Sequence, residues 1–281
     1  MKNVLITVGC SFTEGVGCYD YSSLNNKNPN DLSEKEFQKY YQTQLDNFLM
    51  GSWGTHLQKM LRYDLHINCG IGGSSNSHQI KNFMDTMDSW PDLSKSNVLV
   101  IWQMTYSHRF SFYHLGAPIT FGYDNNDINH SKHSNFIKEF IMNMSDTEFD
   151  RDMGFESLFY LRCMRDICKV NGYNFLFSTV GEPVFDDVLR NYLDKKTLKN
   201  FIEIYDEKEY KTDSPLAYGF AKPTAHCGHP MSDGYKDMAE EYHKWIPQHR
   251  EELLYKGDIT KFKQIPMNRD YRITKEKKRL I

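Results

Sequence analysis

A serine stands in a glycine-bounded turn near the start of the chain, directly after a short apolar run. The segment reads Gly9-Cys10-Ser11-Phe12-Thr13-Glu14-Gly15 and follows the run at residues 4–8. Glycines permit a tight turn, so we expect the Ser11 hydroxyl to project beyond the end of a buried strand, beside backbone N–H groups. A helix N-cap or an ordinary turn residue is the alternative interpretation of this serine.

A second glycine-rich junction follows the next apolar run and precedes a helical pattern. It contains Asn68-x-Gly70-x-x-Gly73-x-Ser75. Backbone amides at such a junction can approach an anion, which suits an oxyanion hole with the Gly73 N–H as one donor. A phosphate cradle is disfavoured because no Gly-Lys-Ser/Thr follows. Asn76 is expected either to cap the helix or to contact a ligand.

A histidine that can act as a base precedes the last amphipathic segment. His229 is followed by Pro230, and a proline disfavours the helical conformation in the residue before it. The His229 imidazole is therefore expected on a fixed loop. A purely structural histidine is the alternative, because spacing alone does not place His229 beside Ser11.

These three elements, in this order, resemble conserved blocks of the SGNH (GDSL-type) hydrolases from residue 1 to about residue 246. The resemblance implies that Ser11 is the nucleophile and His229 the general base. It also implies that the N–H groups of Ser11 and Gly73 stabilise an oxyanion. The expected substrate is then an ester or a related acyl compound.

The third block of that family carries an asparagine whose side chain is a further oxyanion donor. This chain has Thr105 at the aligned position, and its hydroxyl donates one hydrogen bond from a shorter arm. Gln103 and Arg109 lie nearby, so we predict that these two residues and Asn76 bind substrate. A surface ion pair is the alternative role for Arg109.

The family's acid, an aspartate three residues before the histidine, is also replaced. His226 stands there, and a neutral imidazole can accept a hydrogen bond but carries no negative charge. We include His226 among the expected catalytic residues. Asp233 and Glu182 are alternative candidates for the acid. Two further alternatives are a Ser–His pair that works without an acid and a site that has lost hydrolysis.

Cysteines stand near two of these motifs. Cys10 replaces the usual acid of the first block, and Cys227 lies between His226 and His229. Cysteine and histidine together can bind zinc, but this spacing matches no zinc signature. We therefore expect small buried thiols, with neither a metal nor another cofactor.

Four continuous apolar runs alternate with amphipathic segments and so predict the elements that position these residues. The runs at 4–8, 65–69, 98–102 and 173–179 have the pattern of strands covered on both faces. Helical spacing follows at 53–62, 78–87, 155–168 and 233–246. Such alternation predicts a three-layer α/β/α sandwich with a mostly parallel sheet, and the family resemblance implies a flavodoxin-like sheet of SGNH type.

We predict one hydrolase-like domain at residues 1–250 with two insertions and a basic tail. The insertions, at about 19–50 and 110–145, follow predicted strand ends and are expected either to wall a substrate site or to be surface elaborations. The tail, 251–281, holds nine Lys and Arg against three acids from residue 256 onward. It is interpreted as a solvated or packed tail, or else as a docking arm for an acidic partner.

Composition narrows the class of protein. A net charge of −3 argues against bulk nucleic-acid binding, and a mean hydropathy of −0.65 indicates much polar surface. No membrane-length apolar run or signal peptide is present, so a cytoplasmic protein with reduced cysteines is expected. No nucleic-acid or membrane partner is expected.

The combined interpretation is a serine esterase or deacylase that acts on a carbohydrate or small acyl ester. Polar and aromatic residues at 108–114 favour a sugar-like or polar substrate over a long lipid. Two alternatives stay open: a binding or structural protein with a decayed site, and an acyltransferase.

Overall fold

The computed structural model describes residues 1–21, 31–107, 109–114, 117–121, 146–206, 211–254 and 263–265. Residues 22–30 of the first predicted insertion, most of the second insertion and most of the basic tail lie outside this part of the chain. His108 lies outside it as well.

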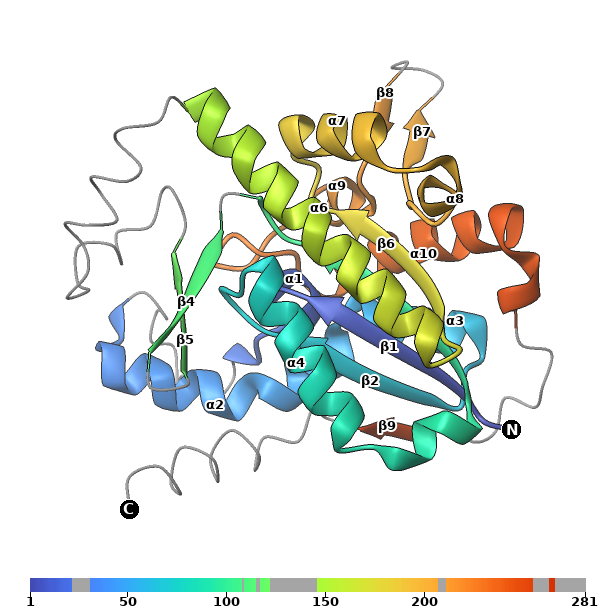
Figure 1. The fold of residues 1–281 in the computed structure, drawn as a ribbon. Coiled ribbons are helices and arrows are strands. Elements are labelled where there is room, and N and C mark those ends of the chain that lie inside the picture. The colour runs from blue at the N-terminus through green and yellow to red at the C-terminus, as the bar shows by residue number, and fades with distance from the viewer. Residues whose placement is uncertain are drawn as a thin grey trace.

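A parallel sheet forms the centre of the molecule, with its strands in the spatial order β6-β3-β1-β2-β9 (Figure 1). These strands are β1 (Asn3–Gly9), β2 (Leu65–Gly70), β3 (Asn97–Met104), β6 (Asn174–Thr179) and β9 (Lys263–Ile265). The first four confirm the predicted strands to within two residues at each end. The fifth comes from the basic tail, which thus supplies an edge strand beside β2.

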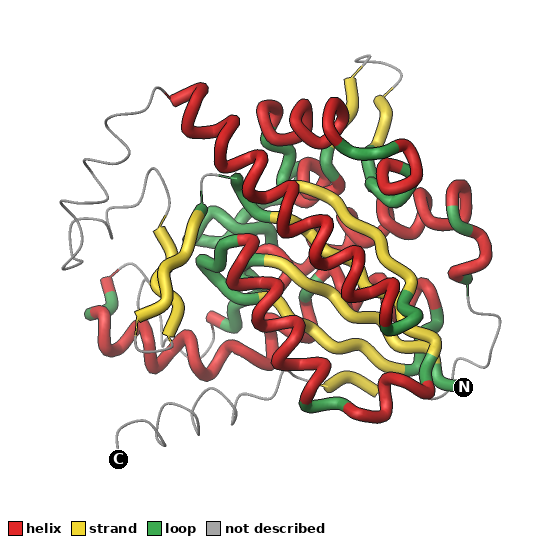
Figure 2. Tube along the Cα trace, viewed as in Figure 1, coloured by secondary structure: helices red, strands yellow, loops and turns green. Residues whose placement is uncertain are grey.

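Helices lie in front of and behind this sheet, as Figure 2 shows, so the predicted α/β architecture is confirmed. They are α1 (Ser11–Glu14), α2 (Glu34–Gly51), α3 (Trp53–Leu61), α4 (Asn76–Asp88), α6 (Asp146–Val170), α7 (Pro183–Tyr192), α8 (Lys195–Leu198), α9 (Pro215–Gly219) and α10 (Ser232–His249). Short 3₁₀ turns, η3 and η5, occupy Pro91–Lys95 and Glu251–Leu253. No helix in the described part of the chain has the length and apolar character needed to cross a membrane.

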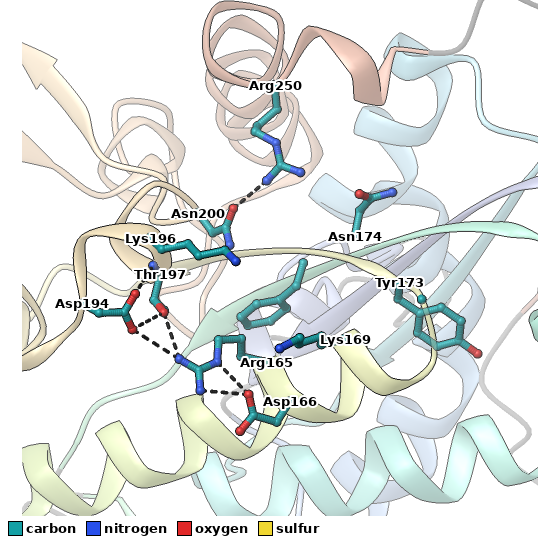
Figure 3. A pocket seen from close by; sticks show the side chains of 12 residues that line it. Arg165, Asp166, Lys169, Tyr173, Asn174, Asp194, Lys196, Thr197, Asn200 and Arg250 are labelled. Atoms are coloured by element: carbon teal, nitrogen blue, oxygen red, sulfur yellow. Dashed lines mark hydrogen bonds and ion pairs between the residues drawn. The ribbon is translucent and has the colours of Figure 1, made fainter.

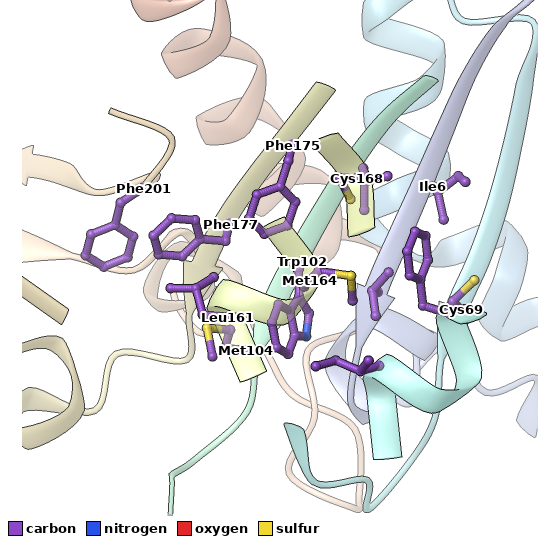
Figure 4. Packing of buried hydrophobic residues seen from close by; sticks show 14 of the residues in the cluster. Ile6, Cys69, Trp102, Met104, Leu161, Met164, Cys168, Phe175, Phe177 and Phe201 are labelled. Carbon is purple, nitrogen blue, oxygen red and sulfur yellow. The ribbon is translucent and has the colours of Figure 1, made fainter. Parts of the chain in front are cut away.

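Alternate residues of each strand explain why both faces of the sheet are covered. On β1, Val4, Ile6 and Val8 pack with α4, α6 and α7, whereas Leu5 packs on the opposite face with α3 and α10. Side chains alternate between the two faces with a period of two, so continuous apolar runs fill both layers. Figure 4 shows the first cluster around Trp102, whose buried Nε1 donates to Gln79 Oε1 at 2.6 Å.

Two short antiparallel hairpins and a long helix lie outside the predicted pattern. The hairpins are β4 (Phe110–His114) with β5 (Ala117–Phe121), and β7 (Ile204–Asp206) with β8 (Lys211–Asp213). Helix α2 occupies the second half of the first predicted insertion. A capping box begins it, in which Glu36 N donates to Ser33 Oγ and Ser33 N donates to the Glu36 carboxylate.

The strand register places the loops that carry the candidate catalytic residues at the same end of the sheet, beyond the carboxyl ends of the strands. Gly9 at the end of β1 pairs with Gly70 at the end of β2, and Val8 pairs with Trp102 of β3. The carboxyl ends of these three strands are therefore level. Loops that leave the carboxyl ends of parallel strands meet in a crevice, which is where open α/β sheets bind ligands.

Candidate active site

Ser11 begins a single helical turn directly beyond β1. Cys10 is still extended (φ −91°, ψ −153°), α1 starts at Ser11, and Gly15 ends the turn in the left-handed conformation (φ 92°). A Cβ on Gly9 would lie 2.1 Å from Thr13 Oγ1, so only glycine lets the turn fold back this tightly. Ser11 is 8% exposed, and its amide is one of the first-turn N–H groups that lack an acceptor within a helix.

The loop that carries His229 is fixed by its own backbone and by the serine loop. Ala225 N donates to the His229 carbonyl at 2.8 Å, and Thr224 forms a β-bridge with Pro230. A Cβ on Gly17 (φ 115°) would lie 2.2 Å from the Pro230 carbonyl oxygen, so the two loops are in direct contact. The imidazole is half-buried and packs against the Phe12 ring at 5.0 Å.

The structure brings Ser11 and His229 together. His229 Nε2 lies 2.8 Å from Ser11 Oγ, a hydrogen-bond distance, and His229 Nδ1 lies 3.2 Å from the carbonyl oxygen of Cys227. A carbonyl only accepts hydrogen bonds, so Nδ1 carries the proton in this arrangement. Nε2 is then the unprotonated nitrogen that accepts from the serine hydroxyl.

Burial is the main influence on the charge of His229. It lowers the pKa of the imidazole below its ordinary value, and the positive charge of Arg109 lowers this pKa further. The hydrogen bond to the Cys227 carbonyl acts in the opposite direction and raises the pKa. The balance keeps His229 neutral at pH 7, and a neutral imidazole is the form that can accept a proton.

The glycine loop after β2 lies against the serine turn. Ile71 N donates to the Gly9 carbonyl at 3.0 Å, and a Cβ on Gly72 would lie 3.9 Å from Ser11 Cβ. Gly73 is exposed and left-handed (φ 71°), and within the described residues no acceptor takes its N–H. This amide is free to meet a ligand atom close to Ser11.

Two motif residues to which the sequence analysis gave no role hold this loop in place. The Glu14 carboxylate accepts from Gly72 N at 2.5 Å and from the Tyr41 hydroxyl at 3.2 Å, so α1, the glycine loop and α2 are joined at one group. Asn68 donates to the Thr13 carbonyl at 2.9 Å. The signal for Glu14 was its place in the serine motif, three residues after Ser11.

Asn76 and Thr105 are brought together, but through the Thr105 backbone. Asn76 Oδ1 accepts from Thr105 N at 2.9 Å, and its Nδ2 donates to Ser157 Oγ at 3.0 Å. The cap of α4 is Ser75, whose hydroxyl accepts from the His78 amide. The Asn76 amide therefore joins α4, α6 and the end of β3.

The Thr105 hydroxyl accepts from Arg109 Nη1 at 3.1 Å, and the Arg109 guanidinium lies 5.2 Å from the centre of the Tyr106 ring. Arg109 is half-buried, and within the described residues no carboxylate is paired with it. In the part of the chain that the structure describes, the other N–H groups of its guanidinium have no acceptor. Because the Thr105 hydroxyl accepts the bond from Arg109, its own hydrogen can still be donated, and its role as an oxyanion donor stays a prediction.

Gln103 lies beneath the serine turn. It is fully buried, and its Oε1 accepts from Thr13 Oγ1 at 3.1 Å. Its buried Nε2 has no hydrogen-bond partner among the described residues. Gln103 is thus placed to brace the turn.

Of the three expected partners for the imidazole, His226 and Glu182 contact other groups, and Asp233 is exposed. His226 Nδ1 lies 3.0 Å from the Tyr21 hydroxyl, and its ring packs against Tyr19 at 4.8 Å. Glu182 accepts from both the amide and the hydroxyl of Ser107 at 2.6 Å, and Asp233 is exposed in the first turn of α10. Within the described residues, no carboxylate is hydrogen-bonded to His229, and the Cys227 carbonyl occupies the orienting position.

Cys10 is fully buried and Cys227 is half-buried. The part of the chain that the structure describes contains no group of three His, Cys, Asp or Glu side chains arranged to hold a metal ion.

A pocket of about 560 Å³ lies at the amino ends of the strands, where β6 begins (Figure 3). Arg165 in this pocket forms ion pairs with Asp166 and Asp194, and Arg250 donates a hydrogen bond to the Asn200 side-chain oxygen. The pocket is separate from Ser11, because the two lie beyond opposite ends of parallel strands.

Comparison of the chain with protein-family models, with curated proteins and with solved structures found no match in any of the three. The arguments below therefore depend on the geometry of this chain.

Proposed function

We propose that this protein is a serine hydrolase of SGNH type that cleaves an ester, with Ser11 as nucleophile and His229 as general base. The observation that carries the proposal is the 2.8 Å contact between His229 Nε2 and Ser11 Oγ at the carboxyl edge of the sheet. The strand order supports the fold assignment, because β2-β1-β3-β6 follows the flavodoxin-like order 2-1-3-4.

The first step is attack of Ser11 Oγ on the ester carbonyl carbon. The Oγ–C bond forms, the hydroxyl proton passes to His229 Nε2, and the carbonyl oxygen takes the negative charge. The N–H groups of Ser11 and Gly73 stabilise this oxyanion, and one such donor contributes about 3 kcal/mol to the transition state. The alcohol then leaves with the proton from Nε2, and the acyl group remains on Ser11.

A water molecule completes the reaction. It adds to the acyl carbon while Nε2 takes one of its protons, and the second tetrahedral intermediate collapses when the bond to Ser11 Oγ breaks. Oγ recovers its proton from Nε2, and the acid is released. If another alcohol replaced water in this step, the same residues would catalyse acyl transfer.

The Cys227 carbonyl orients the imidazole but stabilises its protonated form less than a carboxylate does. Loss of the carboxylate in the trypsin triad lowers kcat by about 10⁴. We therefore expect a slow esterase, in which the backbone donors and substrate binding provide much of the rate.

The substrate is proposed to be small and polar, such as an acylated sugar or another short acyl ester. The guanidinium N–H donors of Arg109 that have no partner among the described residues favour a substrate with a hydrogen-bond acceptor beside the ester. Ser75 and Ser111, joined at 2.6 Å beside α4, add hydroxyl groups on the same side of the sheet.

Hydrolysis of 4-nitrophenyl acetate tests the proposal. Ser11→Ala and His229→Ala should each lower kcat/KM by roughly 10³-fold or more. Ser89→Ala, at the exposed end of α4, is the matched control and should leave the rate unchanged. Full activity in a folded Ser11→Ala protein would overturn the proposal.

A binding protein with a decayed site is the second candidate. The carbonyl in place of a carboxylate beside His229 favours it, because such a site can hold an ester without hydrolysing it rapidly. Tight binding of a polar ester with no turnover would support this candidate.

A further inference from the structure

Arg109 carries a positive charge that no acid balances within the described residues. Its guanidinium is half-buried and contacts two neutral groups there: Nη1 donates to the Thr105 hydroxyl at 3.1 Å, and the guanidinium lies 5.2 Å from the centre of the Tyr106 ring. The Glu182 carboxylate meets the same loop but accepts from the amide and hydroxyl of Ser107 instead. An arginine is always charged, and a charge that is withdrawn from water without a partner is costly.

This charge lies beside the serine and its histidine. Thr105 directly follows β3, whose carboxyl end is level with that of β1 and therefore with the turn that carries Ser11. The positive charge of Arg109 also reaches His229, whose pKa it lowers. A group bound to Arg109 can thus belong to the same molecule whose ester meets Ser11.

One edge of the guanidinium fits a carboxylate. Nη1 is engaged with Thr105, whereas Nε and Nη2 donate to no acceptor in the part of the chain that the structure describes. These two N–H groups match the two oxygens of a carboxylate, which such an edge binds through two parallel hydrogen bonds.

The charge balance favours a carboxylate over a phosphate group. One guanidinium balances one negative charge, whereas a phosphate monoester carries nearly two at pH 7. The Glu182 carboxylate, held by Ser107 two residues before Arg109, makes a second negative charge still less favourable.

We propose that the substrate is an ester that carries a separate carboxylate, which Arg109 binds while Ser11 attacks the ester carbon. This inference rests on the proposed hydrolase and narrows its substrate from a polar ester to an anionic one. An acylated sugar acid, an acylated hydroxy acid and a monoester of a dicarboxylic acid belong to this class. Arg109 thereby determines specificity, because it holds the part of the substrate that does not react.

Two matched pairs of esters test the proposal on the two sides of the ester bond. On the acyl side, mono-4-nitrophenyl adipate has a free carboxylate that methyl 4-nitrophenyl adipate lacks. On the alcohol side, 4-acetoxybenzoate is compared in the same way with methyl 4-acetoxybenzoate. The measurements are made at pH 8, where the carboxylates are ionised and His229 is neutral with or without the charge on Arg109.

The ratio of kcat/KM within a pair is the decisive quantity, because a general loss of activity cancels in it. In the wild type, the charged member of at least one pair should react about 10-fold or more faster than its neutral partner. Arg109→Gln should bring this ratio close to one, and Arg109→Lys, which keeps the charge without the planar fork, should give an intermediate ratio. Arg151→Gln, exposed on α6, is the matched control and should keep the wild-type ratio. A wild-type ratio near one in both pairs, or a ratio unchanged in Arg109→Gln, would overturn the proposal.

Binding separates this inference from the proposed catalysis. Ser11→Ala lacks the nucleophile, so its affinity for each of the four esters can be measured by isothermal titration calorimetry. One charged ester should bind about 10-fold or more tightly than its neutral partner, and this preference should disappear in the double variant Ser11→Ala/Arg109→Gln.

The two readouts fail in different ways. If the wild type hydrolyses none of the esters but Ser11→Ala shows the preference, the proposed hydrolase is wrong and the carboxylate site stands. If hydrolysis occurs without a preference in rate or in binding, the inference is wrong and the hydrolase stands. Equal affinities together with no hydrolysis would contradict both.

Discussion

Ser11 and His229 stand 218 positions apart in the chain, yet Ser11 Oγ and His229 Nε2 lie within 2.8 Å of each other. The second ring nitrogen faces the Cys227 carbonyl, which fixes the tautomer without a negative charge. Burial and Arg109 both lower the pKa of the imidazole. At the residue scale, the site is therefore a neutral imidazole within hydrogen-bond distance of a hydroxyl.

This arrangement predicts the acid limb of the pH profile. General-base action requires neutral His229, so kcat/KM should rise with pH and level off once the pH exceeds the lowered pKa of the imidazole. The midpoint is expected below 6.5, the ordinary histidine value. Initial-rate measurements from pH 4 to 8 would give it, and a midpoint above 6.5 would contradict the account.

The charge on Arg109 should move that midpoint. Replacing it in Arg109→Gln removes a positive charge that lowers the His229 pKa, so the acid limb should shift toward higher pH. Arg151→Gln, on the exposed surface of α6, is the matched control and should leave the limb in place. A limb that stays fixed in Arg109→Gln would show that the two groups do not interact.

At the scale of elements, α1, the glycine loop and α2 meet at the Glu14 carboxylate. This group accepts from Gly72 N and from the Tyr41 hydroxyl, and so it fixes the Ile71–Gly72 peptide, which adjoins the peptide that carries the Gly73 N–H. Glu14 is a positioning residue, since it acts on the proposed oxyanion through the loop.

Glu14→Ala should lower kcat by about 10- to 100-fold with little change in KM, because the Gly73 N–H contributes mainly in the transition state. Glu14→Gln keeps an acceptor and should recover part of the loss. Steady-state kinetics on a polar ester separate the two parameters. A rise in KM alone would assign Glu14 to substrate binding instead.

The elements differ in how far the sequence predicted them. The strands β1, β2, β3 and β6 were predictable because strands covered on both faces are continuously apolar. Helix α2 was missed because its buried positions include Tyr40 and Gln44 and so form no clear apolar stripe, although Ser33 and Glu36 carry a capping-box signal. The strand β9 was missed because an edge strand of three residues has little pattern of its own.

Part of the candidate site was also predictable from the sequence, namely the residues that stand in recognisable motifs. Ser11, Gly73 and His229 stand in short motifs that the chain itself displays. The partners of His226 and Asn76 were not, because Tyr21 and the Thr105 backbone reach them only through tertiary packing.

At the scale of the whole molecule, a buried histidine lies between the sheet and α3. His66 is fully buried, and its ring nitrogens lie 2.8 Å from Thr7 Oγ1 and 3.2 Å from Thr55 Oγ1. Burial lowers the pKa of His66 to about 3. In the folded state it thus stays neutral at acidic pH values where the unfolded chain binds a proton.

Stability should therefore fall as the pH decreases from about 6.5 to about 3. Over that range His66 alone contributes a loss of about 1.4 kcal/mol in the free energy of unfolding per pH unit. In His66→Gln, which has no titrating ring, the pH dependence should be flatter by this amount. Urea denaturation at pH 6.5, 5.5 and 4.5 measures both slopes, and parallel slopes would contradict the assignment.

The most direct test of the central claim is covalent labelling by a fluorophosphonate. An activated serine displaces fluoride from phosphorus, so intact-mass analysis and peptide mapping should show one adduct, on Ser11. Ser11→Ala and His229→Ala should both remain unlabelled while retaining the wild-type circular dichroism spectrum. An unlabelled wild type, or an adduct on another serine, would contradict the account.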